Sequence, residues 1–176
     1  VENNFPKGLP ETGFNYLSQI MIEEITRNFI DYEREYLKKG NELPIIGLEE
    51  NLTYTFDIDG TEVNLTGFAD RIDFANDKVR IIDYKSGQVK DDDVLIKDTS
   101  ENLSDLTEKS LQLTIYKYLY KKNNTEVNIE DIEPAIYGLL KVSNPFFPLK
   151  NCSDAFDNDA LMDTCDIQFE ELFREI

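Results

Sequence analysis

Two stretches of the chain combine a strand pattern with charged residues: Gly67-Phe-Ala-Asp-Arg-Ile-Asp73 and Ile81-Ile-Asp-Tyr-Lys-Ser-Gly87. Asn76-Asp77 lies between them and is a hairpin-turn signal, so the two stretches are predicted to pair as antiparallel strands. If residues 76 and 77 form the turn, Asp70 falls directly opposite Asp83. Opposed residues point to the same face, with their Cβ atoms about 4.5–5.5 Å apart.

This register predicts a site for a divalent cation. Lys85 lies two residues beyond Asp83 and therefore shares its face with both carboxylates. Two carboxylates held this close repel each other, and a divalent cation between them reverses the sign of that interaction. Hard oxygen ligands favour Mg²⁺ or Mn²⁺. A metal-activated water with a lysine beside it is an arrangement suited to cleaving phosphodiesters; the alternative is that these are solvated strand acids.

A third carboxylate extends the predicted acidic row. Asp59-Gly60 is a strong two-residue hairpin signal, and pairing across it places Glu49 opposite Asp70. This extrapolation holds only if no β-bulge intervenes, and bulges are frequent beside active sites. Glu49 is therefore an auxiliary candidate.

The opposite face of the same hairpin has a structural interpretation. Asp73 falls opposite Arg80 and points away from Asp70, which predicts a cross-strand ion pair. Arg71 also points away from the acidic row and is expected to pair locally.

The remaining elements follow from the spacing of apolar residues. A long helix is expected from about residue 14 to Gly40, with one apolar stripe of residues three or four apart that predicts packing in a core. Strands are expected at about 45–56, 62–74, 78–85 and 135–142, with helices at about 108–122 and from about 163. Irregular segments are expected at 1–12, 88–108 and 143–162. The sequence predicts an α/β fold in which a mixed sheet, an antiparallel three-stranded meander plus a further strand, is flanked by helices.

Composition limits the function. The 176 residues contain 36 acidic and 18 basic side chains, a formal charge of −18, which argues against a free-standing nucleic-acid-binding surface. The absence of His excludes Ser-His-Asp catalysis and His-ligated zinc within this chain. Cys152 and Cys165 are either a disulfide or, as we expect, two reduced thiols in a cytoplasmic protein. No apolar run is long enough to cross a membrane.

The motifs Gly67–Asp73, Ile81–Gly87 and Gln112–Tyr116, in this order, resemble the signature of PD-(D/E)XK nucleases, which have a restriction-endonuclease-like fold. The most similar branch is the RecB/AddB-like nuclease domain attached to DNA-repair helicases. The resemblance covers roughly residues 45–141. It implies a metal-dependent DNA exonuclease in recombination and repair, with DNA and a helicase domain or subunit of a bacterial-type complex as partners.

The resemblance also assigns roles to residues. It implies that Asp70 and Asp83 bind the metal with the Tyr84 backbone carbonyl, and that Lys85 is the catalytic lysine. Gln112 and Tyr116 match the motif on the following helix and lie four apart, on one helical face; the alternative is ordinary helix surface.

Two departures from the family motivate an alternative. The family usually has a metal-binding His on an N-terminal helix, and Cys152 and Cys165 do not match the AddB iron–sulfur spacing. We expect residues 1–176 to be a single nuclease-like domain from a longer protein, so that the His lies upstream. If the His is lost, the domain is a catalytically inactive scaffold in a helicase complex.

Overall fold

The computed structural model describes residues 12–97, 102–152 and 157–175, and the chain divides into two compact units, residues 1–41 and 42–176. The lead-in expected at residues 1–11, and the parts of the expected irregular segments at 98–101 and 153–156, lie outside the described residues. A single nuclease-like domain over the whole chain remains a prediction.

The first unit contains one helix, α1, at Gly13–Lys38. Thr12 precedes it with extended backbone, and Gly40 follows it with φ +86°, a left-handed conformation that glycine adopts without strain. Ion pairs one turn apart, such as Arg34 with Asp31 at 2.6 Å, line its polar side. None of its residues is buried, because a single helix has no second element within its own unit to pack against.

The second unit is built on a five-stranded mixed sheet in the order β1-β2-β3-β5-β6. The β1–β2, β2–β3 and β5–β6 pairs are antiparallel, whereas β3 and β5 are parallel. The strands are β1 Ile45–Ile58, β2 Thr61–Ala75, β3 Lys78–Lys85, β5 Ile132–Gly138 and β6 Phe146–Pro148. This confirms the expected α/β class, in which a meander is extended by a parallel strand.

Both predicted hairpin turns are confirmed. Asn76 and Asp77 adopt φ of 55° and 60°, as a tight turn with two left-handed residues requires. Asp59 and Gly60 do the same between β1 and β2, with φ of 53° and 87°. Local turn chemistry therefore sets the register of all three strands of the meander.

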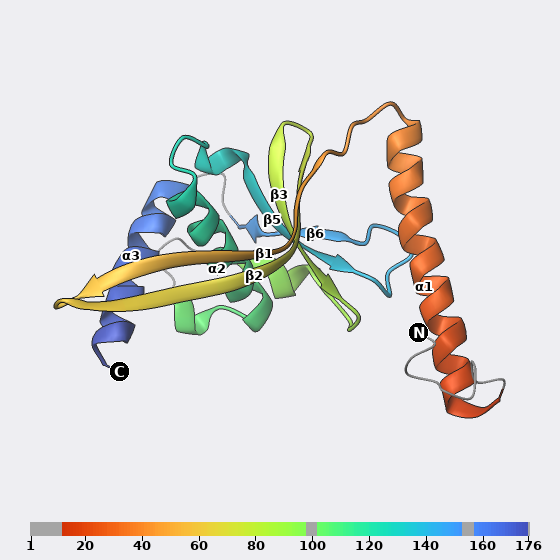
Figure 1. The fold of residues 1–176 in the computed structure, drawn as a ribbon, viewed down its shortest axis with the longest axis horizontal. Helices are drawn as coiled ribbons and strands as arrows, with labels where there is room; N and C mark the ends of the chain where they lie inside the picture. Colours follow the sequence, from red (N-terminus) through yellow and green to blue (C-terminus); the bar gives the residue numbers. More distant parts are fainter. Residues whose placement is uncertain (1–11, 98–101, 153–156, 176) are drawn as a thin grey trace. The chain divides into compact units, whose positions relative to one another are not determined.

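Two helices pack against the long β1–β2 hairpin (Figure 1). They are α2 at Glu108–Asn123 and α3 at Asn158–Arg174. Aromatic rings join them to the hairpin: Phe56 of β1 lies 6.3 Å from both Tyr118 of α2 and Phe169 of α3, measured between ring centroids. This cluster anchors α2, the helix that carries Gln112 and Tyr116.

Several boundaries differ from the sequence-based expectations. The strand expected at 135–142 is β5, which begins at Ile132 because it pairs with Val79 at the start of β3. The segment expected to be irregular at 143–162 contains β6, the two-residue strand β7 (Lys150–Asn151) and the start of α3. The 88–108 segment contains a 3₁₀ turn at Asp91–Val94 and the strand β4 (Leu95–Ile96), which pairs with β7.

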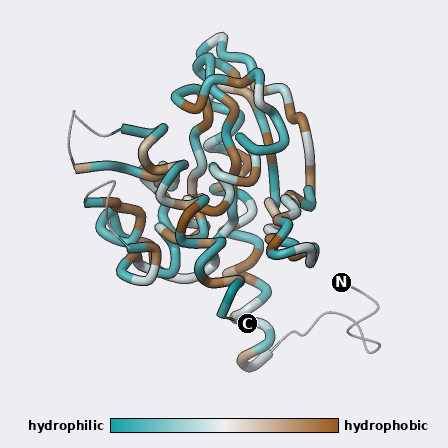
Figure 2. The backbone as a smooth tube through the Cα atoms, turned by 90° about the vertical axis from the view of Figure 1, so that its left-hand side faces the viewer, coloured by the Kyte–Doolittle hydropathy of each residue, from teal (hydrophilic) through white to brown (hydrophobic). Residues whose placement is uncertain are grey.

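Hydrophobic and hydrophilic residues alternate in short stretches along the backbone (Figure 2). Among the described residues no helix is both long enough and apolar enough to span a bilayer. Cys165 is a buried free thiol and Cys152 an exposed one, as expected for two reduced cysteines.

Candidate active site

The β2–β3 hairpin brings Asp70 and Asp83 together. Arg71 pairs with Ile82 in the ladder, so the next position outward places Asp70 opposite Asp83, as the turn predicts. The Asp70 carboxylate accepts a hydrogen bond from the Tyr84 backbone N–H at 2.6 Å. Asp83 is buried, with 5% of its surface exposed. The backbone of β3 therefore orients the Asp70 carboxylate, while the Asp83 carboxylate is largely shielded from water.

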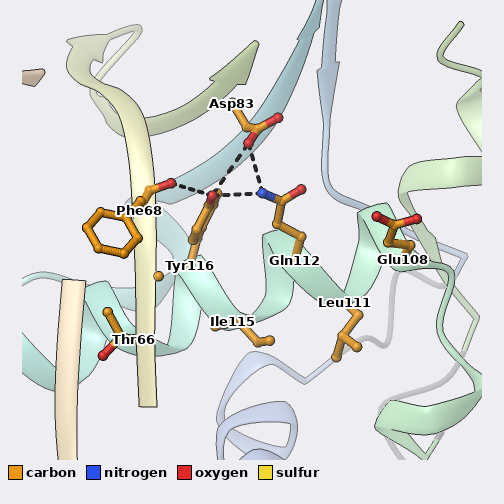
Figure 3. Close-up of a pocket in the computed structure, with 9 residues that line it drawn as sticks. Thr66, Phe68, Asp83, Glu108, Leu111, Gln112, Ile115 and Tyr116 are labelled. Carbon is orange, nitrogen blue, oxygen red and sulfur yellow. Dashed lines mark hydrogen bonds between the residues drawn. The ribbon is translucent and has the colours of Figure 1, made fainter. Parts of the chain in front are cut away.

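Helix α2 supplies the groups that hold Asp83. Its first turn is capped by Thr107, whose hydroxyl oxygen accepts from the Ser110 N–H at 3.1 Å. One face then presents Gln112 and Tyr116 to the sheet (Figure 3). Gln112 Nε2 donates to Asp83 Oδ1 and lies near the Tyr116 hydroxyl, both at 2.8 Å.

Tyr116 links this network to β2. Its hydroxyl donates to the Phe68 carbonyl at 2.5 Å and lies 3.5 Å from Asp83 Oδ1 (Figure 3). Burial raises the pKa of Tyr116 to about 12, and the negative charges of Asp83 and Asp70 act in the same direction. The phenol is therefore a neutral donor throughout the physiological pH range.

Gly67 lets α2 approach β2 closely enough for these contacts. A Cβ atom at this position would lie 3.0 Å from the Tyr116 ring and 3.2 Å from the Leu119 side chain. Any larger residue would have to displace the helix or its side chains. The glycine of the first motif therefore helps to position the tyrosine of the third.

The second oxygen of Asp83 faces Lys85. The Lys85 ammonium lies 2.9 Å from Asp83 Oδ2 in an ion pair, and its side chain is 35% exposed. Oδ2 is buried, and within the described residues it has no hydrogen-bond donor besides this ammonium. A buried carboxylate oxygen with spare acceptor capacity, beside a second carboxylate, fits a hard divalent cation such as Mg²⁺ or Mn²⁺.

Glu49 lies at its expected register position but not in a carboxylate cluster. Its neighbours Glu50 and Leu48 pair with Ala69 and Arg71, which places Glu49 opposite Asp70. Glu49 itself has φ +53° and is exposed. Within the described ranges, no three acidic, His or Cys side chains form a group that could hold a metal.

On the opposite face of the hairpin, the negative charge of a buried carboxylate is balanced by two arginines. Asp73 is fully buried and accepts from Arg80 Nε at 2.6 Å and from Nη2 at 2.8 Å. Arg71 Nε lies 2.7 Å from the same carboxylate. The predicted cross-strand ion pair is confirmed, and the local partner of Arg71 is Asp73.

A groove of about 460 Å³ opens beside these residues. Its lining comprises Thr66, Gly67, Phe68, Asp83, Glu108, Leu111, Gln112, Ile115 and Tyr116. Sequence reasoning assigned no role to Glu108 or Phe68. Glu108 lies four residues before Gln112, which in turn lies four before Tyr116, so helical spacing alone places Glu108 on the same face of α2. The accepting role of the Phe68 carbonyl follows only from the docking of α2 against β2.

One comparison with known proteins identifies the superfamily that the three motifs resemble. The family model described as the PD-(D/E)XK nuclease superfamily matches residues 1–171. No curated protein sequence matches the chain. Among solved structures, the one titled "Crystal structure of SSO0001" aligns at 12% identity with a TM-score of 0.28, over 96% of this chain and 66% of that chain.

Proposed function

Because the chain belongs to the PD-(D/E)XK nuclease superfamily, we propose that it hydrolyses DNA phosphodiester bonds with Mg²⁺ or Mn²⁺. One observation carries the proposal: a buried carboxylate, Asp83, lies in a groove with one oxygen held by Gln112 and the other facing Lys85. Acid, amide and lysine converge there from β3 and α2.

In this proposal Asp70, Asp83 and the Tyr84 backbone carbonyl hold the metal. The bound cation would supply a more acidic water and polarise a phosphoryl oxygen. Glu49, at the register position opposite Asp70, is an auxiliary candidate for this side of the site. The Asp70 carboxylate already accepts the Tyr84 N–H, which orients it without neutralising its charge.

The chain's own side chains position the reacting groups. Lys85 is a compact positive charge that can move from Asp83 to a phosphate oxygen when substrate enters, because it is partly exposed. There it would stabilise the negative charge that develops on the phosphoryl group. Gln112 and Tyr116 keep Asp83 oriented and contribute no net charge.

The test is cleavage of labelled linear DNA in Mg²⁺, in Mn²⁺ and in chelator by the wild type and by Asp83→Asn. We expect metal-dependent cleavage that Asp83→Asn lowers by about 10³-fold or more, because several kcal/mol of transition-state stabilisation depend on the ligand. Asp77→Asn, an exposed acid in the turn of the same hairpin, is the matched control. Full activity in Asp83→Asn would refute the mechanism.

We further propose that the chain acts as a RecB/AddB-like exonuclease served by a helicase domain or subunit. The order of the three motifs supports this, and a net charge of −18 suits a module to which a partner delivers DNA. Exonucleolytic action predicts that linear single strands are degraded while circular single strands of the same sequence persist. Equal cleavage of both would contradict the assignment.

An inactive scaffold is the second candidate, favoured by the absence of His from the chain. It predicts no cleavage with either metal. It also predicts no saturable Mn²⁺ binding and no rise in thermal midpoint on adding Mn²⁺. The nuclease and the scaffold therefore differ in a binding readout as well as in activity.

A further inference from the structure

The groove beside Asp83 has an unusual lining for a site that receives DNA. Among its nine lining residues, all within the described part of the chain, none is Lys or Arg, and two, Asp83 and Glu108, are acidic. Phosphate contacts, which usually provide most nucleic-acid affinity, have no cationic partner on these walls. Apolar and aromatic side chains, among them Phe68, Leu111 and Ile115, make up much of the remaining lining.

Phe68 is the exposed aromatic side chain of this lining. It is 65% exposed, although a phenylalanine ring normally gains free energy from burial. Its backbone is firmly held, because its carbonyl accepts the Tyr116 hydroxyl and the residue pairs with Asn51 of β1. The ring projects from β2 on the same side as Thr66, away from Tyr116 and Gln112, and only the Phe68 carbonyl points toward Tyr116 (Figure 3). The result is a free aromatic face on a rigid support.

The position of Phe68 relates it to the proposed chemistry. It precedes Asp70 by two residues on β2, so the two side chains leave the strand on the same side, about 7 Å apart along it. A nucleotide whose base contacts Phe68 is therefore adjacent to one whose phosphate reaches Asp70 and Asp83. The carbonyl of the same residue is part of the network that holds Asp83.

Resting on the proposed nuclease function, we propose that Phe68 is a stacking platform for an unpaired base and selects single-stranded DNA. An aromatic face binds any base by stacking, without sequence preference. In a duplex both faces of an internal base are already covered by its neighbours, so the platform has nothing to bind. The nine residues that line the groove add no positive charge to that of the neighbouring Lys85, so these walls offer no further attraction for the denser charge of a duplex.

The test measures Kd for a fluorescein-labelled single-stranded oligonucleotide, with Ca²⁺ in place of Mg²⁺, by anisotropy. We expect Phe68→Ala to raise this Kd about 5- to 150-fold and Phe68→Trp to leave it unchanged or lower it. The matched control is Phe74→Ala, which removes another exposed aromatic ring of β2 outside the groove. The slope of log Kd against log salt should stay the same in Phe68→Ala, since no phosphate contact is removed.

An abasic scan locates the contact. One abasic nucleotide, moved stepwise along the oligonucleotide, should weaken wild-type binding at one position, and this penalty should vanish in Phe68→Ala. Equal Kd values for wild type and Phe68→Ala, or equal losses in Phe68→Ala and Phe74→Ala, would overturn the proposal, as would wild-type protein that does not bind the single strand. Cleavage that depends on Asp83 would still stand in those cases. If Phe68→Ala loses binding, Phe74→Ala keeps it and the wild type does not cleave DNA, the stacking proposal would stand and the nuclease proposal would be refuted.

Discussion

Asp70 and Asp83 on one face of the β2–β3 hairpin contrast with Asp73 on the other. Asp73 is fully buried and its carboxylate contacts two guanidinium groups, Arg71 and Arg80. Asp83 is nearly as buried, but it contacts an amide, a phenol and one partly exposed lysine. Each face therefore buries a carboxylate to a similar depth, but Asp73 has two positively charged partners and Asp83 has one.

The difference separates stability from function. A buried carboxylate between two arginines has its charge fully compensated by the chain, so it needs no ligand. Two opposed carboxylates with a single lysine carry excess negative charge, which a divalent cation can balance. Substitutions on each face and metal binding can therefore break or sharpen this contrast.

Asp73→Asn should lower the free energy of unfolding by about 3–5 kcal/mol, because it leaves the buried Arg71 and the partly buried Arg80 without their shared counter-charge. Urea denaturation measures the change. Asp77→Asn, in the exposed turn next to this pair, is the control and should change stability little. A loss in Asp73→Asn no larger than in Asp77→Asn would show that the ion-paired face contributes no stability.

Lys85→Met should reduce the cleavage rate about 10²- to 10³-fold, as removal of a transition-state donor typically does. Single-turnover kinetics on single-stranded DNA measures the rate. The control is Lys78→Met, which removes an ion-paired lysine from the other end of the same strand, where its partner is Glu133. Equal rates in Lys85→Met and wild type would exclude the lysine from the chemistry.

Mn²⁺ should stabilise the wild type by about 2.7 kcal/mol at a concentration 100 times its Kd, because only the folded state presents both carboxylates. Thermal unfolding with and without Mn²⁺ measures this. Asp83→Asn should lose the protection. The Asp73→Asn variant, although less stable, should keep it, and loss of the metal effect in both would contradict the separation of the two faces.

Tyr116→Phe should cost about 1 kcal/mol of stability, since it removes a hydroxyl that donates to the Phe68 carbonyl. Tyr120→Phe, one turn further along α2, is the control. The effect should depend on pH. Because the folded pKa of Tyr116, about 12, exceeds its ordinary value of 10.0, its stabilisation is complete below pH 10 and disappears as pH rises through 12.

The wild type should therefore lose more stability than Tyr116→Phe between pH 10 and pH 12. Denaturation curves at several pH values in this range compare the two proteins. Parallel losses in both would show that the phenol does not titrate as its surroundings predict.

Local sequence determined the meander and the placement of its charges. Turn chemistry at Asp59-Gly60 and Asn76-Asp77 sets the registers, and a two-residue periodicity then assigns every side chain to a face. For this reason the opposition of Asp70 to Asp83 and the Asp73–Arg80 pair could be predicted without the structure. The spacing of Gln112 and Tyr116 likewise follows from the helical repeat.

Tertiary structure decided what those residues contact. The bond from Tyr116 to the Phe68 carbonyl joins residues 48 positions apart, and it depends on the close approach that Gly67 permits. Short strands such as β6 and the start of α3 lack a periodic signal and form because a distant partner is present. The sequence alone thus determined where the charges lie on the hairpin. Only long-range packing decided which carboxylate is compensated and which stays open to a ligand, because that depends on the groups that other elements bring to each face.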